Sequence, residues 1–331
     1  MDKIIEMLEI VRDHPTGTTS AIAEYMCISR QAALSKVKKL VSDGVVKATG
    51  SGKGTRYEVA DTQNHLVLGI DDNLDEFIVW SKHIYPLLYK GIKKNVVDIL
   101  SYGFTEMLNN VKDHSDGSEC VVTISVNPLR TKIRILDNGV GIFEKIKKAF
   151  NLQNVEESIF ELSKGKLTTD ANNHTGEGVF FSSKVFDRFA LISKGWAFTH
   201  SHGSDIHVMQ ETDYLDGTLV MMEIANNSTK ELTEVFEQFT SGLNFSKTLV
   251  PVKLAQIEGF TLMSRSQAKR LVTRFEKFSD VLLDFKDVQI VGQGFADQLF
   301  RVFKNEHPNV NLIPINMSED VEFMVRHVGG I

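Results

Sequence analysis

The sequence predicts a multidomain α+β protein, and three observations support this fold class. The chain has 331 residues, which is too long for one ordinary hydrophobic core and suggests two or three domains. The periodicity changes along the chain, from short amphipathic helices, through helices mixed with alternating strands, to regular strand-helix alternation after about residue 247. Hydrophobic residues make up 42 % of the chain and charged residues 24 %, as in globular proteins.

Composition excludes several classes of protein. No apolar run approaches the roughly 20 residues that cross a bilayer, so we expect no membrane span. The start, MDKIIEMLEIVRDH, has acids within its apolar pattern and lacks the order of a signal peptide, which favours a cytoplasmic protein. Cys27 and Cys120 lie in different predicted domains and predict neither a disulfide framework nor a zinc cluster. The net charge of −6 argues against a uniformly basic coat but allows a local basic patch.

Residues 1–60 predict three short helices followed by a β-hairpin. The third helix is expected from Ser29, a suitable N-cap, to Asp43, and Gly44 ends it. The stretch VVKATGSGKGTRYEV places two β-prone arms around glycines, which is typical of a hairpin.

This order resembles the winged helix-turn-helix fold over the whole segment. Seven Lys or Arg residues against one acid lie between residues 29 and 56, where that fold meets double-stranded DNA. The alternative is a domain that only contacts protein, with lysines that aid solubility. The candidate DNA-binding residues are Arg30, Gln31, Ser35, Lys36, Lys39, Lys53 and Arg56.

A column of polar residues marks the stretch FTEMLNNVKDHSDG, residues 104–117. Glu106, Asn110 and His114 recur every four positions and therefore share one face of a helix. An apolar stripe beside them would bury the other side of the helix, which places the column at the rim of a core. A solvated helix face is the alternative. The stripe consists of Phe104, Met107, Leu108 and Val111.

Further motifs surround this helix. Residues 61–71 predict a polar connector, 72–89 an apolar-aromatic helix, and 120–126 and 132–137 two strands. Asp137 ends the second strand in DNGVGI, where glycines leave room for a ligand, although a tight turn would look the same. TGEG, residues 175–178, precedes a helical pattern that offers free N–H groups to phosphate. Thr218 starts a later strand.

Together these motifs resemble the GHKL ATPase superfamily over residues 90–226, which implies an α/β sandwich (Bergerat fold) that binds Mg²⁺ and ATP. In that resemblance Asn110 is the amide ligand of Mg²⁺, and Glu106 is the acid that polarises attacking water or a protein hydroxyl. His114 matches a basic position near the phosphates, or is a helix-end histidine that favours the dipole. Asp137 matches the acceptor of the adenine amino group.

The same resemblance assigns the remaining motif positions. Gly139 and Gly141 let the nucleotide approach, Gly176 and Gly178 form the lid hinge and phosphate turn, and Thr218 lies near adenine. The lid is expected at about 143–178, and Glu177 separates its glycines, unlike the glycine run of histidine kinases.

Lysines and a histidine near these motifs leave alternatives open. Lys164 or Lys166 would either reach phosphate or be ordinary surface lysines. His83 lacks an adjacent acid, so we interpret it as a helix-face residue rather than the phosphoacceptor of a histidine kinase.

Residues 247–331 predict a small, largely parallel sheet with helices and resemble STAS domains, in particular the STAS-like module found beside GHKL ATPases. STAS regulators carry a phosphorylatable serine where this chain has GQGF, residues 292–295, so no phosphorylation is expected there. The resemblance implies protein interaction, including docking on the ATPase domain of the same chain; a packing or dimer module is the alternative.

These expectations describe a regulator that responds to ATP, with domains at 1–60, 61–89 (connector and helix), 90–246 and 247–331. It would bind Mg-ATP and DNA and hydrolyse ATP slowly. The alternatives are an anti-sigma-type serine/threonine kinase that acts on a protein partner, or an ATP-driven dimer clamp. A homodimer is compatible with each.

Overall fold

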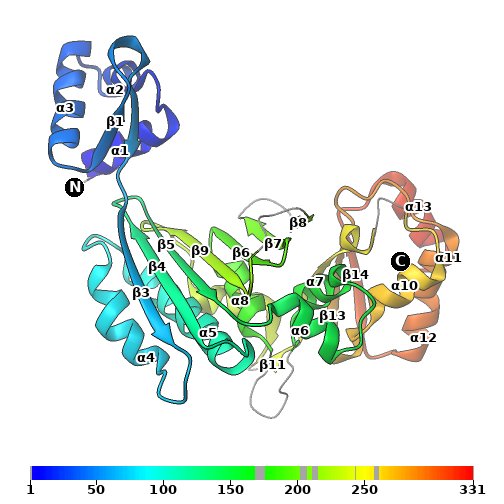
Figure 1. The fold of residues 1–331 in the computed structure, drawn as a ribbon. Helices are drawn as coiled ribbons and strands as arrows, with labels where there is room; N and C mark the ends of the chain where they lie inside the picture. The colour runs from blue at the N-terminus through cyan, green and yellow to red at the C-terminus, as the bar shows by residue number, and fades with distance from the viewer. Residues whose placement is uncertain are drawn as a thin grey trace.

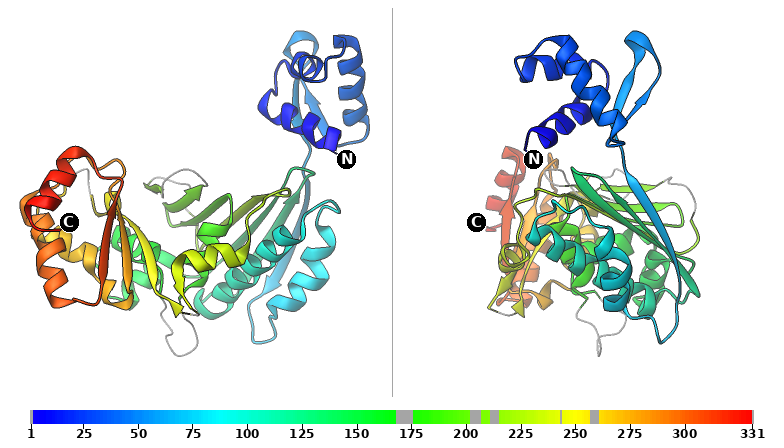
Figure 2. Two further views of the ribbon diagram at one scale, coloured as in Figure 1. Left: turned by 180° about the vertical axis from the view of Figure 1, so that it is seen from behind. Right: turned by 90° about the vertical axis from the view of Figure 1, so that its left-hand side faces the viewer.

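The structure is a computed structural model that describes residues 2–167, 176–201, 207–210, 215–242, 244–256 and 261–330. It is a mixed α/β protein of several domains (Figure 1). Its buried hydrophobic residues form three clusters: one in an N-terminal unit, one on a large central sheet, and one centred on a C-terminal unit. The N-terminal unit projects from one end of the sheet in all views (Figure 2).

The N-terminal unit contains three helices and a hairpin, as the sequence predicts. The Ser29 hydroxyl accepts a hydrogen bond from the Ala32 N–H at 3.2 Å and so caps the third helix. The two strands of the hairpin pair antiparallel, with Val46 opposite Val59. The elements are α1 (Asp2–Asp13), α2 (Thr18–Tyr25), α3 (Arg30–Ser42), β1 (Val46–Thr49), a short 3-10 turn (Gly52–Gly54) and β2 (Arg56–Val59).

The central sheet has seven strands in the order β3-β4-β5-β9-β6-β7-β8. The segment expected as a polar connector contains its edge strand, β3 (Thr62–Gly69), which pairs antiparallel with β4. Leu66 and Leu68 alternate with exposed residues and pack on the core. The strand was not predicted because polar residues surround this short period-two pattern in the sequence. The other strands are β4 (Glu119–Val126), β5 (Arg130–Asp137), β6 (Arg188–Ser193), β7 (Trp196–Ser201), β8 (His207–Gln210) and β9 (Leu219–Ala225).

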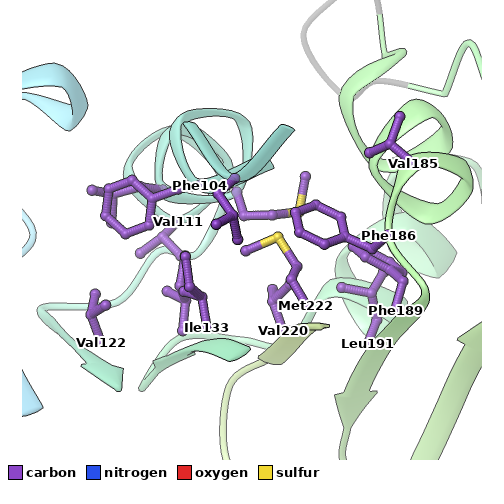
Figure 3. Packing of buried hydrophobic residues seen from close by; sticks show 14 of the residues in the cluster. Phe104, Val111, Val122, Ile133, Val185, Phe186, Phe189, Leu191, Val220 and Met222 are labelled. Atoms are coloured by element: carbon purple, nitrogen blue, oxygen red, sulfur yellow. The ribbon is translucent and has the colours of Figure 1, made fainter. Parts of the chain in front are cut away.

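Helices pack on one face of this sheet. Phe104 and Val111 of the long helix α5 meet Ile133 and Val220 of the strands, and Phe186 follows helix α8 into the same layer (Figure 3). Gly103 permits this packing, because a Cβ there would lie 2.3 Å from the Phe186 ring. The helices are α4 (Glu76–Val79), which continues as a π turn (Trp80–Ile84) and a 3-10 turn (Tyr85–Leu87), α5 (Lys94–His114), α6 (Ile142–Ala149), α7 (Val155–Lys164), α8 (Gly178–Val185) and α9 (Leu232–Phe239).

The C-terminal unit alternates strands and helices around a small parallel sheet of order β12-β13-β14, which confirms the predicted architecture. A two-residue pair, β10 (Thr240–Ser241) with β11 (Asn244–Phe245), precedes it. The elements are β12 (Lys247–Pro251), a 3-10 turn (Val252–Ala255), α10 (Arg265–Val272), a 3-10 turn (Phe275–Lys277), β13 (Asp280–Asp284), α11 (Gln293–Ala296), a π turn (Asp297–Phe303), α12 (Lys304–Glu306), β14 (Asn311–Ile315) and α13 (Glu319–His327).

Neither a disulfide nor a membrane span is present in the described part of the chain. Cys27 is exposed, Cys120 is buried, and both thiols are free. Over the described residues, no helix combines the length and apolar character that crossing a bilayer requires.

Candidate functional site

A pocket lies between helix α5, the end of strand β5, the start of strand β9 and the segment that leads into helix α8. Residues from four separate motifs of the sequence meet in it, although more than 100 positions separate the first from the last. The predicted site residues that line this pocket are Glu106, Asn110, His114, Asp137, Gly176, Gly178 and Thr218.

The polar column of α5 forms one wall of the pocket. The helix buries its apolar stripe against the sheet, so Glu106, Asn110 and His114 lie half-buried at the rim rather than on a solvated face. The Asn110 Nδ2 group makes a long contact of 3.9 Å with Met107 Sδ, and its Oδ1 atom accepts no hydrogen bond from a described residue. An amide oxygen in this position can serve a hard cation such as Mg²⁺.

Asp137 is buried at the other end of the pocket. Its Oδ1 atom accepts hydrogen bonds from the backbone N–H groups of Gly139 at 2.8 Å and Thr218 at 3.2 Å, which fix the side chain. Burial raises the pKa of Asp137, and the backbone hydrogen bonds oppose that shift. Both bonds go to Oδ1, and no described residue donates a hydrogen bond to Oδ2, which can therefore accept one from a ligand.

Thr218 closes this end of the pocket. Its hydroxyl accepts a hydrogen bond from the Ile142 N–H at 2.9 Å, and its carbonyl accepts one from the Asp137 N–H at 3.1 Å. The hydroxyl proton of Thr218 can still be donated. The strand β9 and the start of α6 are therefore tied to Asp137 by a short hydrogen-bonded loop.

Three glycines shape the backbone around Asp137. A Cβ at Gly139 would lie 2.0 Å from the Ser115 carbonyl oxygen, and one at Gly141 would lie 2.5 Å from the Ser193 hydroxyl. Gly217, which the sequence did not single out, has φ +78°, and its Cβ would lie 2.0 Å from the Asp137 carbonyl oxygen. Gly139 and Gly141 do not line the pocket. In the structure they allow the loop after β5 to pack closely against Ser115 and Ser193.

The remaining predicted glycines lie where the lid segment returns to the pocket. Gly176 has φ +71°, and its carbonyl accepts a hydrogen bond from the Leu167 N–H at 3.3 Å. A Cβ at Gly178 would lie 2.2 Å from Glu106 Oε2, so this glycine lets the start of α8 approach the carboxylate. Residues 168–175 of the expected lid lie outside the described residues.

Two acidic residues, Glu106 and Glu177, line this end of the pocket. Burial, together with the charges of Glu106 and Glu177, raises the pKa of Tyr102, which lies one helical turn before Glu106. The candidate catalytic acid therefore has a second acid nearby, Glu177, which the sequence predicts only as a residue between two glycines.

Other lining residues were not predicted. Lys145 of α6 lines the pocket, and its Nζ atom lies 2.9 Å from Asp116 Oδ2. It follows Ile142 by one turn, a spacing that points both side chains the same way and that could have signalled a shared site. The unpredicted apolar lining comprises Met107, Val111, Ile142, Ile146, Leu162, Leu167, Val179, Leu191 and Val220.

Lys164 and Lys166 do not line the pocket. Lys164 is completely buried, and its Nζ atom contacts Glu161 Oε1 at 2.5 Å and the Thr273 carbonyl at 3.0 Å. The Lys166 Nζ atom donates to the Lys277 carbonyl at 2.9 Å. Both lysines hold the C-terminal unit, and each of the two predicted alternatives, phosphate contact and free surface lysine, is wrong for Lys164.

The candidate DNA-binding residues belong to α3 and the hairpin of the N-terminal unit. Arg30, Gln31, Ser35, Lys36 and Lys39 are exposed on α3, and Arg56 is exposed on the hairpin, while the side chain of Lys53 lies outside what the structure describes. A groove between α3, the start of α2 and the hairpin is lined by Arg30 and Gln31 but not by the other predicted residues.

Some of these side chains already have protein partners. The Arg30 guanidinium donates to the Ser20 hydroxyl, and Arg56 Nε lies 2.7 Å from Glu58 Oε1. Thr18, Thr19 and Tyr57 also line the groove and were not predicted.

The described residues contain no cluster of three or more His, Cys, Asp or Glu side chains that could hold a metal ion. A cation in the pocket would therefore take most of its ligands from the bound molecule and from water, with Asn110 as a protein ligand. That arrangement is typical of Mg²⁺, which keeps several waters and binds substrate phosphates.

A family model for a STAS-like domain of unknown function, DUF4325, matches residues 267–322, so this part of the C-terminal unit is STAS-like, as the sequence predicts. A search of the curated proteins finds no match.

Proposed function

We propose that this protein is an ATP-responsive regulator in which residues 90–246, extended by β3, form a GHKL-type domain that binds Mg-ATP. The observation that carries the proposal is the single pocket into which seven of the predicted nucleotide-site residues converge. None of the motifs is specific alone, and their convergence is what the resemblance to GHKL ATPases requires.

Asp137 would select adenine. Its Oδ2 atom can accept a hydrogen bond from the exocyclic amino group, whereas guanine presents a carbonyl oxygen there and would be repelled by the carboxylate. The apolar lining, which includes Ile142 and Val220, suits the faces of a purine ring.

The other end of the pocket would hold the triphosphate. Asn110 would be the protein ligand of Mg²⁺, which when bound offsets phosphate charge, and Lys145 and His114 lie on the same walls. Glu106 would accept a proton from an attacking water or hydroxyl. Its carboxylate lines the pocket and lies close to Gly178, the proposed phosphate turn, which supports this role.

The N-terminal unit would bind double-stranded DNA as a winged helix-turn-helix domain. The basic and polar residues of α3 are exposed, and the hairpin stands beside them across a groove. ATP can change DNA affinity only if it binds one arrangement of the units better than another.

Titration calorimetry with Mg-ATP on the full chain tests the nucleotide site. We expect saturable binding that Asn110→Ala weakens, because the Mg²⁺ ligand is lost. Asn109→Ala is the matched control, since the neighbouring amide does not line the pocket. Absence of heat with the unaltered chain would overturn the proposal.

Labelled ATP separates the possible activities. Free phosphate that disappears in Glu106→Gln indicates hydrolysis, and label on a STAS-domain protein indicates the anti-sigma-type kinase activity instead. DNA affinity with and without ATP tests the switch, and Lys36→Ala together with Lys39→Ala should weaken DNA binding and lower its salt dependence by about one unit of slope per lysine.

A further inference from the structure

We infer that Arg274, which the STAS-like domain supplies, is a positioning residue for the nucleotide site: it holds the stem of the lid where the lid enters the pocket. This inference rests on the proposed function and extends it, because it makes the C-terminal unit a structural part of the ATP site.

The guanidinium of Arg274 is buried against the end of α7. Its Nη1 atom donates to Glu161 Oε2 at 3.1 Å, and its Nη2 atom donates to the Gly165 carbonyl at 2.9 Å and to the Lys166 carbonyl. The side chain is only 10 % exposed. One planar group thus fixes a carboxylate and two consecutive carbonyls, a task that the fork of an arginine performs and a lysine ammonium does not.

Lys164 completes the contact from the opposite side. It reaches from α7 to the Thr273 carbonyl in the turn that carries Arg274, and its Nζ atom lies 4.3 Å from the centroid of the Phe160 ring. Glu161 pairs with both Lys164 and Arg274, so the buried carboxylate keeps one partner if Arg274 is removed. Truncation of Arg274 therefore does not leave an unpaired buried anion.

The backbone on both sides of this contact is constrained. Arg274 has φ +68° and Lys166 has φ +51°, a left-handed region that side chains with a Cβ enter only when the surrounding structure requires it. The Lys166 Nζ atom in turn donates to the Lys277 carbonyl, three residues beyond Arg274. Each segment is held in its unusual conformation by the other.

The contact continues directly into the pocket. Leu167 follows Lys166, lines the pocket and pairs its N–H with the Gly176 carbonyl. Gly176 leads within two residues to Gly178, which touches Glu106. A shift of the Gly165 and Lys166 carbonyls would therefore move Leu167 and the segment that begins at Gly176, which border the proposed phosphate end. Asp137 and Thr218, at the proposed adenine end, are tied to other elements.

The test compares Arg274→Gln and Arg274→Lys with the unaltered full chain, using binding of ATP and of adenosine. We expect ATP to bind about tenfold more weakly to both variants, as loss of one or two charged hydrogen bonds implies, and adenosine to bind unchanged. Arg270→Gln is the matched control, because Arg270 lies at the same interface and its side chain pairs with Glu157 of α7 at 3.7 Å. Arg270 meets the lid stem through its backbone carbonyl, which accepts from Lys164 Nζ at 3.5 Å and which the substitution retains.

The outcomes separate the inference from the function on which it rests. If the unaltered chain binds neither ligand, the proposed function and the inference both fail. If it binds ATP and the Arg274 variants bind ATP equally well, the inference alone is overturned; equal losses for ATP and adenosine also overturn it, because they indicate a general structural role. If Arg274→Gln does not fold, the test uses Arg274→Lys and the lid-side variant Glu161→Gln. Hydrogen exchange of residues 161–167 is measured in both, and exchange no faster than in the unaltered chain overturns the inference.

Discussion

The two ends of the pocket are built in different ways. At the end proposed to hold adenine, Asp137 is buried and fixed by backbone N–H groups of Gly139 and Thr218. At the end proposed to hold the phosphates, the border is the segment after α7, which Arg274 and Lys164 tie to the C-terminal unit. The first arrangement suits a fixed choice of ligand, and the second suits an affinity that depends on where the STAS-like domain sits.

The largest effect should come from the adenine end. Asp137→Asn replaces a charged acceptor, and loss of a hydrogen bond to a charged group costs about 1.5–3 kcal/mol, which corresponds to roughly a 10- to 150-fold weaker affinity for ATP. Calorimetry with ATP and GTP measures this loss. We expect the preference for ATP over GTP to shrink with it, and an unchanged preference would show that Asp137 does not read the base.

A smaller effect should follow from crowding the phosphate end. In Gly178→Ala the new Cβ would lie 2.2 Å from Glu106 Oε2, so the carboxylate must rotate aside. Because a flexible side chain absorbs the clash, the thermal midpoint should change little, while hydrolysis should fall about tenfold from misplacement of the acid. The phosphate-release rate measures this change, with Glu106→Gln as the reference for complete loss. A wild-type rate would place the reacting centre elsewhere.

The smallest expected effect is a pH dependence of ATP affinity that arises from Asp137 alone. Burial raises the pKa of Asp137 above its ordinary value of 3.8, and in the proposed function it is the carboxylate form that accepts the hydrogen bond from adenine. ATP affinity should therefore fall as the pH drops through a value above 3.8, by at most about tenfold per pH unit. ATP affinity is measured as a function of pH for the unaltered chain and for Asp137→Asn, and the variant should lack this pH-dependent loss.

Stability should change in the opposite sense. A carboxyl group with a raised pKa in the folded state favours folding most below its unfolded pKa, and this contribution is lost as the pH rises through the folded pKa. Asp137→Asn should thus be no less stable than the unaltered chain near neutral pH in the absence of nucleotide, which separates weak binding from poor folding.

The sequence predicts the site motifs but not the tertiary contacts that position them. The spacing of Glu106, Asn110 and His114 fixes a shared face because helical geometry is local, and Asp137 follows from a strand end. The parallel sheet of the C-terminal unit likewise follows from alternation of strands and helices.

Contacts between distant segments left no local signal. Lys164 looks like any lysine near a helix end, yet it is buried because residues more than 100 positions away supply its carbonyl partners. Arg274 and Gly217 act through close approach of separate loops, and β3 is a strand only because β4 offers it a partner. Tertiary context of this kind decides burial and pairing, and a single sequence does not display it.

The join between the N-terminal unit and the sheet contains only Ala60 and Asp61 between β2 and β3. The Asn127 amide donates to Asp61 Oδ1 at 2.6 Å, and Leu129 of the same turn packs into the hydrophobic cluster of the N-terminal unit. The hairpin and the edge strand are therefore rigidly connected. A tilt of the sheet would therefore carry α3 with it, because the short join and the contacts of Asp61 and Leu129 couple the orientation of the N-terminal unit to that of the sheet.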